Sequence, residues 1–97
     1  MANLTVDEAA EAEIDEARSY IEQDSAKAAA AFPAEIRHVF RLIADAPKQW
    51  PRYGRRYRFF ALRNHSYVIY YRIADDNTVR VVAIAHSSRR PGYWKGR

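Results

Sequence analysis

The sequence predicts an α+β fold, in which an antiparallel helix hairpin packs on a twisted antiparallel sheet of three to four strands. Two observations predict it. Apolar residues recur every three or four positions in the first half of the chain, and every second position from about residue 57 onward. The 97 residues, 48% of them hydrophobic, suffice for one hydrophobic core. We therefore expect residues 1–97 to form a single domain.

The first helix is expected over residues 7–23. Ala10, Ile14, Ala17 and Ile21 fall on one stripe at helical spacing. Acidic residues concentrate in the first turns, where the helix dipole favours negative charge. Before this helix, residues 3–6 alternate weakly in polarity, which fits either a short edge strand or an unstructured leader.

The second helix is expected to begin after Asp24 and Ser25, both good amino-terminal caps, and to end at Ala46 before a proline. The link between the helices is so short that they must lie antiparallel. Pro33 conflicts with an unbroken helix because it lacks a donor and its ring clashes with the preceding turn. We expect a kink or a restart within residues 29–33.

Three strands rich in aromatic and β-branched residues are expected at Tyr57–Arg63, Ser66–Ala74 and Thr78–His86. Hairpin turns are expected between them at residues 64–65 and 75–77. In the middle strand Ile69, Tyr71 and Ile73 point to one face, and Val68, Tyr70 and Arg72 to the other. One face of the sheet can therefore cover the helices while the other carries function.

Several classes of site and location are disfavoured by composition. The chain has no cysteine, and its three histidines lack ligand spacing, so we expect no disulfide, no metal site and no cofactor. The amino terminus is acidic rather than basic, and no run of about 18 apolar residues occurs. We expect a cytoplasmic protein that does not associate with a membrane.

The two halves of the chain carry opposite charge. Residues 1–47 hold four Lys or Arg against ten Asp or Glu, a balance of −6, whereas residues 48–97 hold twelve against two, a balance of +10. Such asymmetry in a small domain indicates a partner of negative charge, either nucleic acid or an acidic protein segment. The alternative is that the basic strand faces are simply solvated.

The most concentrated basic segment is residues 48–63, KQWPRYGRRYRFFALR, which alternates arginines with aromatic residues. Guanidinium groups bind phosphates or carboxylates in forked geometry, and aromatic rings offer stacking faces to bases. The combination suits RNA or an acidic peptide. It also suits a structural interpretation, in which Trp50 and Tyr53 pack the loop against the helices.

Catalysis has one candidate arrangement. No serine lies in a recognisable nucleophile turn, and there is no cysteine. His86 closes the last strand and could exchange a proton with RNA, with Arg89 or Arg90 steadying the phosphate and Tyr93 supplying a hydroxyl. The alternative is that His86 is a hydrogen-bonded structural residue.

The chain as a whole resembles the RelE/ParE superfamily of toxins, which belong to type II toxin-antitoxin systems and are often labelled plasmid stabilisation proteins. The resemblance runs from about Val6 to Trp94, and the segments that carry it are EAEIDEARSYIEQDS, ADAPKQWPRYGRRYRFFALRNHSYVIYYRI and VRVVAIAHSSRRPGYW. It implies two antiparallel helices on a twisted antiparallel sheet, with a short first strand that residues 3–6 supply. It also implies a cognate acidic antitoxin whose partly disordered carboxy-terminal segment folds around the toxin.

The superfamily has two branches with different targets. RelE-like members resemble small ribonucleases that cleave mRNA on the ribosome, whereas ParE-like members inhibit DNA gyrase without known chemistry. Where the nuclease pattern has an arginine in the strand, this chain reads Ser66-Tyr67-Val68, and its tail is shortened to PGYWKGR. The resemblance therefore favours a growth-inhibiting, non-catalytic ParE-like toxin.

Two sets of site residues follow from this resemblance. The alternative, a ribosome-dependent mRNA endoribonuclease, would use Arg56, His86, Arg89 and Tyr93. Contact with the antitoxin or the target is expected from the basic surface made by Arg52, Arg55, Arg56, Arg58, Arg63, Arg89, Arg90, Tyr93 and Trp94.

Overall fold

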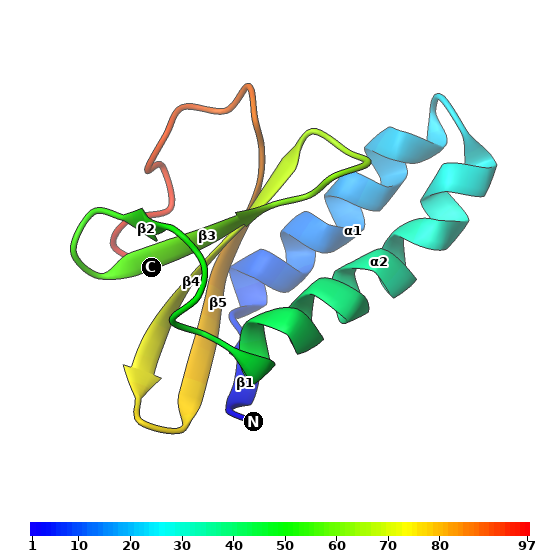
Figure 1. Ribbon diagram of the computed structural model, residues 1–97. Coiled ribbons are helices and arrows are strands. Elements are labelled where there is room, and N and C mark those ends of the chain that lie inside the picture. The colour runs from blue at the N-terminus through cyan, green and yellow to red at the C-terminus, as the bar shows by residue number, and fades with distance from the viewer.

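The protein is described by a computed structural model that covers residues 1–97 (Figure 1). Its elements follow the chain as β1 (Asn3–Val6), α1 (Glu8–Glu22), α2 (Ala26–Asp45), β2 (Arg52–Tyr53), β3 (Tyr57–Ala61), β4 (Tyr67–Asp75) and β5 (Thr78–His86). The strands form one five-stranded sheet in the order β1-β5-β4-β3-β2. Figure 1 shows α1 and α2 side by side on one face of this sheet. The predicted α+β fold is confirmed.

The helices begin and end within a residue or two of the predicted bounds. The Ser25 side chain caps α2 as predicted, because its Oγ accepts a hydrogen bond from the Ala28 amide at 3.0 Å. Of the predicted kink or restart near Pro33, the restart was wrong, since α2 continues through this residue. Phe32 and Ile36 on either side of it are buried in the core, and their packing offsets the lost backbone hydrogen bond. Neither helix has the length and apolarity needed to cross a membrane.

The sheet is larger than predicted, and it is mixed rather than antiparallel. β1 is a strand, but it pairs in parallel with β5, from Asn3 opposite Thr78 to Val6 opposite Val81. The two-residue strand β2 adds an edge on the other side by pairing with the start of β3. Both are short edge strands, whose sequences carry too few residues to indicate a partner or its direction.

The three long strands form the predicted meander, with one difference at the first turn. β3 ends at Ala61 and β4 begins at Tyr67, so residues 62–66 form a loop instead of a two-residue turn. The second turn is tight, and the Asn77 amide donates to the Asp75 carboxylate at 2.9 Å. A register shift opposite Tyr70 and Tyr71 skips Val82 in the β4–β5 pairing. This bulge explains why the consecutive residues Val82 and Ala83 both pack on the outer face of the sheet, the face opposite the helices, while Val81 and Ile84 on either side of them pack on the inner face.

The predicted alternation along β4 is confirmed from Tyr67 to Tyr71, whereas Ile73 lies outside the main core and lines a hollow with Arg72. Tyr67, Ile69 and Tyr71 are buried in the main core with the apolar stripes of both helices. Tyr70 instead packs in a second cluster on the opposite face. Tyr71 is fully buried, and its hydroxyl donates to the Pro47 carbonyl at 2.7 Å, which ties the chain after α2 to the middle of the sheet.

Replacing Tyr71 tests this central position. Tyr71→Ala should lower the free energy of unfolding by about 3 to 5 kcal/mol, because it removes a fully buried ring. Tyr71→Phe keeps the ring and loses only the hydrogen bond to Pro47, which should cost about 1 kcal/mol. Denaturant unfolding of both variants measures the difference. Equal losses from the two substitutions would show that the ring does not fill the core.

Candidate functional site

The outer face of the sheet is covered by the chain's own tail, residues 87–97. Trp94 is 1% exposed and lies against the rings of Tyr57 and Tyr70, with centroid separations of 4.5 and 4.6 Å. Tyr53 closes the same cluster at 5.6 Å from Trp94. Aromatic pairs at these separations stabilise beyond the area they bury. Trp94, predicted to meet a partner, therefore lies inside the chain and supports the surface rather than forming it.

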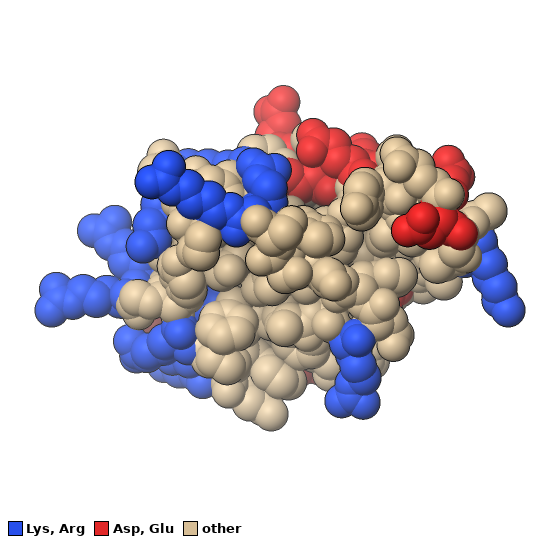
Figure 2. Space-filling view, turned by 90° about the horizontal axis from the view of Figure 1, so that it is seen from above, with Lys and Arg blue, Asp and Glu red and all other residues tan.

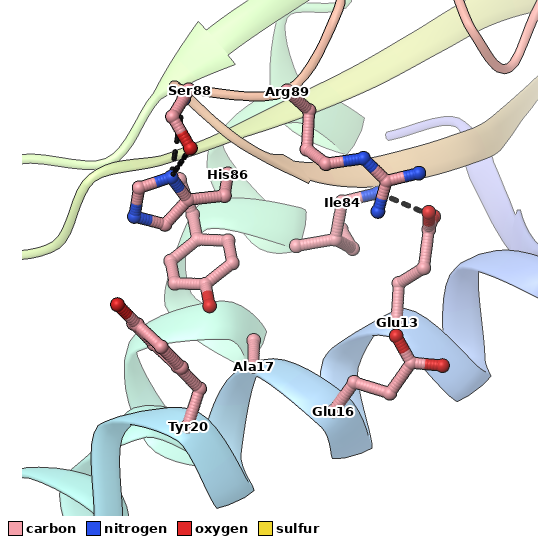
Figure 3. A pocket seen from close by; sticks show the side chains of 9 residues that line it. Glu13, Glu16, Ala17, Tyr20, Ile84, His86, Ser88 and Arg89 are labelled. Atoms are coloured by element: carbon pink, nitrogen blue, oxygen red, sulfur yellow. Dashed lines mark hydrogen bonds between the residues drawn. The ribbon is translucent and has the colours of Figure 1, made fainter.

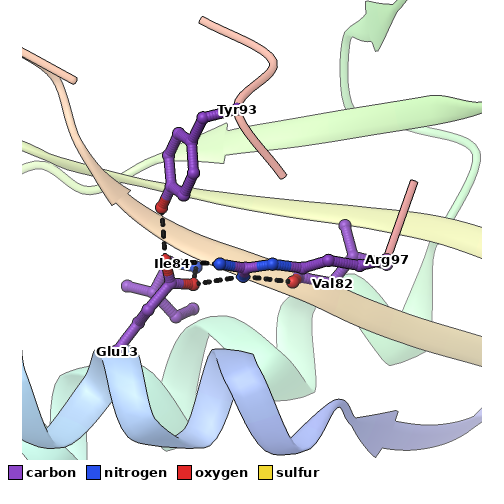
Figure 4. Close-up of polar contacts among 5 residues, drawn as sticks. All are labelled: Glu13, Val82, Ile84, Tyr93 and Arg97. Atoms are coloured by element: carbon purple, nitrogen blue, oxygen red, sulfur yellow. Dashed lines mark hydrogen bonds and ion pairs between the residues drawn. The ribbon is translucent and has the colours of Figure 1, made fainter. Parts of the chain in front are cut away.

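A single carboxylate ties this tail to the first helix (Figure 4). Glu13 of α1 is only 8% exposed and accepts hydrogen bonds from the Ile84 amide at 3.1 Å, from Arg97 Nη1 at 2.8 Å and from the Tyr93 hydroxyl. Arg97 also donates to the Val82 carbonyl at 3.1 Å. We call Glu13, Tyr93 and Arg97 the Glu13 knot.

The Glu13 knot changes the protonation equilibria of its members. Burial alone would raise the pKa of Glu13, but the hydrogen bonds from Arg97, Tyr93 and the Ile84 amide outweigh it, so the pKa lies below its ordinary value. Burial, and then the hydrogen bond to Glu13, raise the pKa of the Tyr93 hydroxyl. At neutral pH the knot therefore pairs a carboxylate with a guanidinium and a neutral phenol.

An open cleft of about 330 Å³ lies between α1 and the end of β5 (Figure 3). We call it the α1–β5 cleft; its lining residues are Glu13, Glu16, Ala17, Tyr20, Tyr67, Ile84, His86, Ser88 and Arg89. Tyr20 and His86 point into it from opposite sides, with their rings edge to face at 5.9 Å. Tyr20 is 55% exposed, although it is a large aromatic residue. The cleft thus combines aromatic and apolar walls with a guanidinium at the rim.

Arg89 at the rim is held in place by Tyr93, another residue of the tail. Its guanidinium carbon lies 4.0 Å from the centroid of the Tyr93 ring, within the range of a cation–π contact. Tyr93 in turn is fixed by Glu13. The position of Arg89 therefore depends on the Glu13 knot.

His86 is engaged locally. Its Nδ1 accepts a hydrogen bond from the Ser88 amide at 3.1 Å and lies 2.7 Å from the Ser88 hydroxyl. Because Nδ1 is an acceptor, the neutral ring carries its proton on Nε2. The contacts match those of a residue that shapes the turn after β5.

The four residues predicted for RNA cleavage do not meet at one point. His86 and Arg89 line the α1–β5 cleft, whereas Arg56 lines a different hollow and the Tyr93 hydroxyl is bonded to Glu13. A proton donor and a phosphate-binding group must lie within hydrogen-bond reach of the same substrate atoms. This arrangement gives RNA cleavage little geometric support.

The predicted contact arginines occupy three places. Arg52, Arg55, Arg56 and Arg58 line a hollow of about 480 Å³ at the beginning of β3. Lys48 and Arg72 complete its charged lining, and we call these six side chains the arginine cradle. Arg63 lies apart, in a hollow beside the β3–β4 loop, and Arg90 is exposed in the tail. Which of them a partner contacts stays a prediction.

Arg58 also has a structural role within the cradle. Its Nη1 donates to the Lys48 carbonyl at 3.1 Å and to the Trp50 carbonyl at 2.7 Å, so it fixes the segment that leads from α2 to β2. The neighbouring turn reverses at Gly54, whose φ of +67° few other residues adopt. This turn leaves Arg55 and Arg56 exposed at its tip.

The charges separate in space as they do in sequence. In the view of Figure 2 most of the visible Lys and Arg side chains gather toward one end of the molecule, and most of the visible Asp and Glu side chains lie on another part of the same face. Only two ion pairs form within the chain, Asp7 with Arg80 and Glu13 with Arg97. Most of the basic side chains therefore lack an acidic partner in the chain itself.

Three residues of the site were missed by sequence reasoning: Glu13, Tyr20 and Arg97. The burial of Glu13 could have been predicted from its position. It lies three residues after Ala10 and four before Ala17, and so falls within the apolar stripe of α1. A carboxylate on a buried stripe needs a partner. No local signal indicated that the partner would be Arg97, 84 residues away.

Comparisons with known proteins agree with the fold. The family described as the ParE toxin of type II toxin-antitoxin system, parDE, matches residues 4–91. A solved structure described as the chromosomal ParDE TA system from P. aeruginosa is similar with a TM-score of 0.74 and 16% sequence identity, over 89% of this chain and 96% of that one. At that identity the likeness shows the fold alone. A comparison with curated protein sequences gives no match.

Removing the charge of Glu13 tests the Glu13 knot. Glu13→Gln should lower the free energy of unfolding at pH 7 by about 1 to 3 kcal/mol, because Arg97 and Tyr93 lose a charged acceptor. The ordinary pKa is 4.5 and the folded value is lower, so the wild-type carboxylate stabilises fully above about pH 4.5 and loses this effect as the pH falls below it. The difference in the free energy of unfolding between Glu13→Gln and the wild type should therefore become smaller as the pH falls below about 4.5.

Denaturant unfolding between pH 3 and pH 7 measures this difference in the free energy of unfolding. Glu16→Gln is the matched control, because Glu16 lies one turn further along α1 and forms no hydrogen bond or ion pair within the chain. A loss of stability that is the same at every pH would mean that the carboxylate charge does not hold the tail.

Proposed function

The chain belongs to the ParE toxin family of type II toxin-antitoxin systems, and from this membership we propose that it inhibits growth by blocking DNA gyrase until a cognate acidic antitoxin covers it. The observation that supports a non-catalytic action is the separation of the residues that RNA cleavage would need, since His86 and Arg89 line the α1–β5 cleft and Arg56 lines the arginine cradle. A toxin that acts by binding does not need these groups at one point; it needs only an accessible surface of the right shape and charge.

The antitoxin is proposed to anchor in the α1–β5 cleft. A segment that orders on binding must bury apolar surface to offset the loss of conformational entropy, and the walls formed by Tyr20, Tyr67 and Ile84 offer such surface. Arg89 at the rim and Arg90 beside it would meet acidic residues of the segment. Glu16 faces the cleft from α1, so the acidic side of the segment should lie toward the tail and its apolar side toward the helix.

The second candidate function is cleavage of mRNA on the ribosome. One observation favours it, namely that His86 and Arg89 line the same cleft. The Tyr93 hydroxyl and Arg56, which this function would also need, are directed elsewhere. Inhibition of gyrase therefore has the better support.

Replacing Tyr20 tests the proposed antitoxin site. Tyr20→Ala should leave the melting temperature nearly unchanged, because the side chain is more than half exposed, yet weaken binding of the cognate antitoxin by about tenfold or more. Calorimetric titration measures the affinity. Arg89→Ala should also weaken binding, with a loss that shrinks as salt rises. The control is Tyr20→Phe, which keeps the ring; unchanged affinity of Tyr20→Ala would place the antitoxin elsewhere.

A supercoiling assay tests the proposed target. Purified toxin added to gyrase, ATP and relaxed plasmid should block supercoiling, and prior addition of the antitoxin should restore it. Primer extension on mRNA from cells that express the toxin provides the contrasting measurement. Normal supercoiling at a stoichiometric excess of toxin would argue against gyrase as the target, and new cut ends in translated messages would identify a nuclease instead.

A further inference from the structure

The arginine cradle concentrates positive charge without an acidic partner in the chain. Neither of the chain's two ion pairs involves any of its six side chains. Arg52 and Arg58 are direct cross-strand partners in the β2–β3 pairing, an arrangement in which like charges repel. A hollow lined by charges of one sign attracts ions of the opposite sign and raises their local concentration. The structure therefore indicates an anionic ligand at this hollow.

The cradle lies in a notch in the sheet. The pairing of β3 with β4 begins at Arg58, which lies opposite Tyr71. Residues 72–75 of β4 therefore have no partner in β3. Charged side chains reach the notch from the loop after α2, from β2, from the β2–β3 turn, and from β3 and β4. Arg58 is braced by two backbone carbonyls, and this holds the Lys48–Trp50 side of the notch in position.

The lining argues for phosphate groups over an acidic polypeptide. Apart from the six cations, only Tyr57 and Ile73 line the hollow. A peptide that orders on contact needs apolar surface, which the α1–β5 cleft has and the cradle lacks. Phosphates need only charge and forked donors, which guanidinium groups supply in matching geometry.

The aromatic residues argue for a duplex over a single strand. Proteins that bind single strands stack bases on free aromatic rings. Here Tyr53, Tyr57 and Tyr70 are packed against Trp94, so the rings nearest the cradle are already engaged. Arg55 and Arg56, by contrast, are exposed at the tip of the turn, where they can reach a phosphate backbone without any contact to bases.

We propose that the arginine cradle binds the phosphodiester backbone of duplex DNA, independently of base sequence. The proposal rests on the proposed function for the source of that DNA, because a topoisomerase holds duplex DNA as it works. Binding of DNA by the isolated toxin involves no gyrase, however. Either proposal can therefore fail in its own assay while the other stands.

Fluorescence anisotropy with a labelled 20-base-pair DNA duplex tests the proposal. The logarithm of the affinity should fall linearly with the logarithm of the salt concentration, by about 0.9 for each phosphate that the protein neutralises. Arg55→Ala/Arg56→Ala should bind more weakly and reduce this slope by about 2, whereas Arg55→Lys/Arg56→Lys should keep most of it. Duplexes of unrelated sequence should bind equally well.

Two controls make the result specific. Arg18→Ala removes the same type of charge from an exposed position on α1 and should bind like the wild type. A single-stranded RNA and a glutamate-rich peptide, used as competitors, should displace the duplex poorly. The proposal is overturned if the Arg55→Ala/Arg56→Ala variant, shown by its melting to be folded, keeps the wild-type slope, or if the RNA or the peptide binds the cradle more tightly than the duplex.

Discussion

The arrangement of the functional surfaces depends on the buried carboxylate of Glu13. It collects hydrogen bonds from Ile84, Tyr93 and Arg97, which lie 71, 80 and 84 residues further along the chain. A buried carboxylate is costly unless such donors surround it, and removing one partner leaves the others uncompensated. The same contact joins α1 to the edge of β5 and holds the tail over the outer face, where Trp94 is buried. The sheet is thereby covered on both faces, by helices on one and by the tail on the other.

This internal pairing decides which basic side chains remain available to a partner. Arg97 and Arg80 are neutralised by Glu13 and Asp7, and Arg58 is engaged by backbone carbonyls. Two groups of the remaining cations lie in different chemical environments: Arg89 at the rim of the aromatic α1–β5 cleft, and the side chains of the almost purely cationic cradle. A partner that folds on contact suits the first, and a rigid polyanion suits the second. Much of the formal excess of basic residues in the second half of the chain thus lies on two surfaces.

The parts of the fold that could be predicted are those whose signal is local. Helical stripes located α1 and α2, the Ser25 cap located a helix start, and alternation assigned Ile69 and Tyr71 to the helix-facing side. The parallel pairing of β1 could not be predicted, because a four-residue strand does not reveal its partner. The burial of Trp94 and the partners of Glu13 depend on contacts between residues far apart in sequence. The candidate site was accordingly predicted as one basic surface, while the division of its arginines among separate hollows required the tertiary structure.

The separation of the two surfaces is the central claim, and hydrogen–deuterium exchange of the toxin tests it most directly. Exchange is measured for the free protein, for the antitoxin complex and in the presence of duplex DNA. The account predicts that the antitoxin protects amides in residues 13–20 and 84–90, and that DNA protects amides in residues 52–58 and 72–73. Protection of the same residues by both ligands, or of neither region by either, would contradict it.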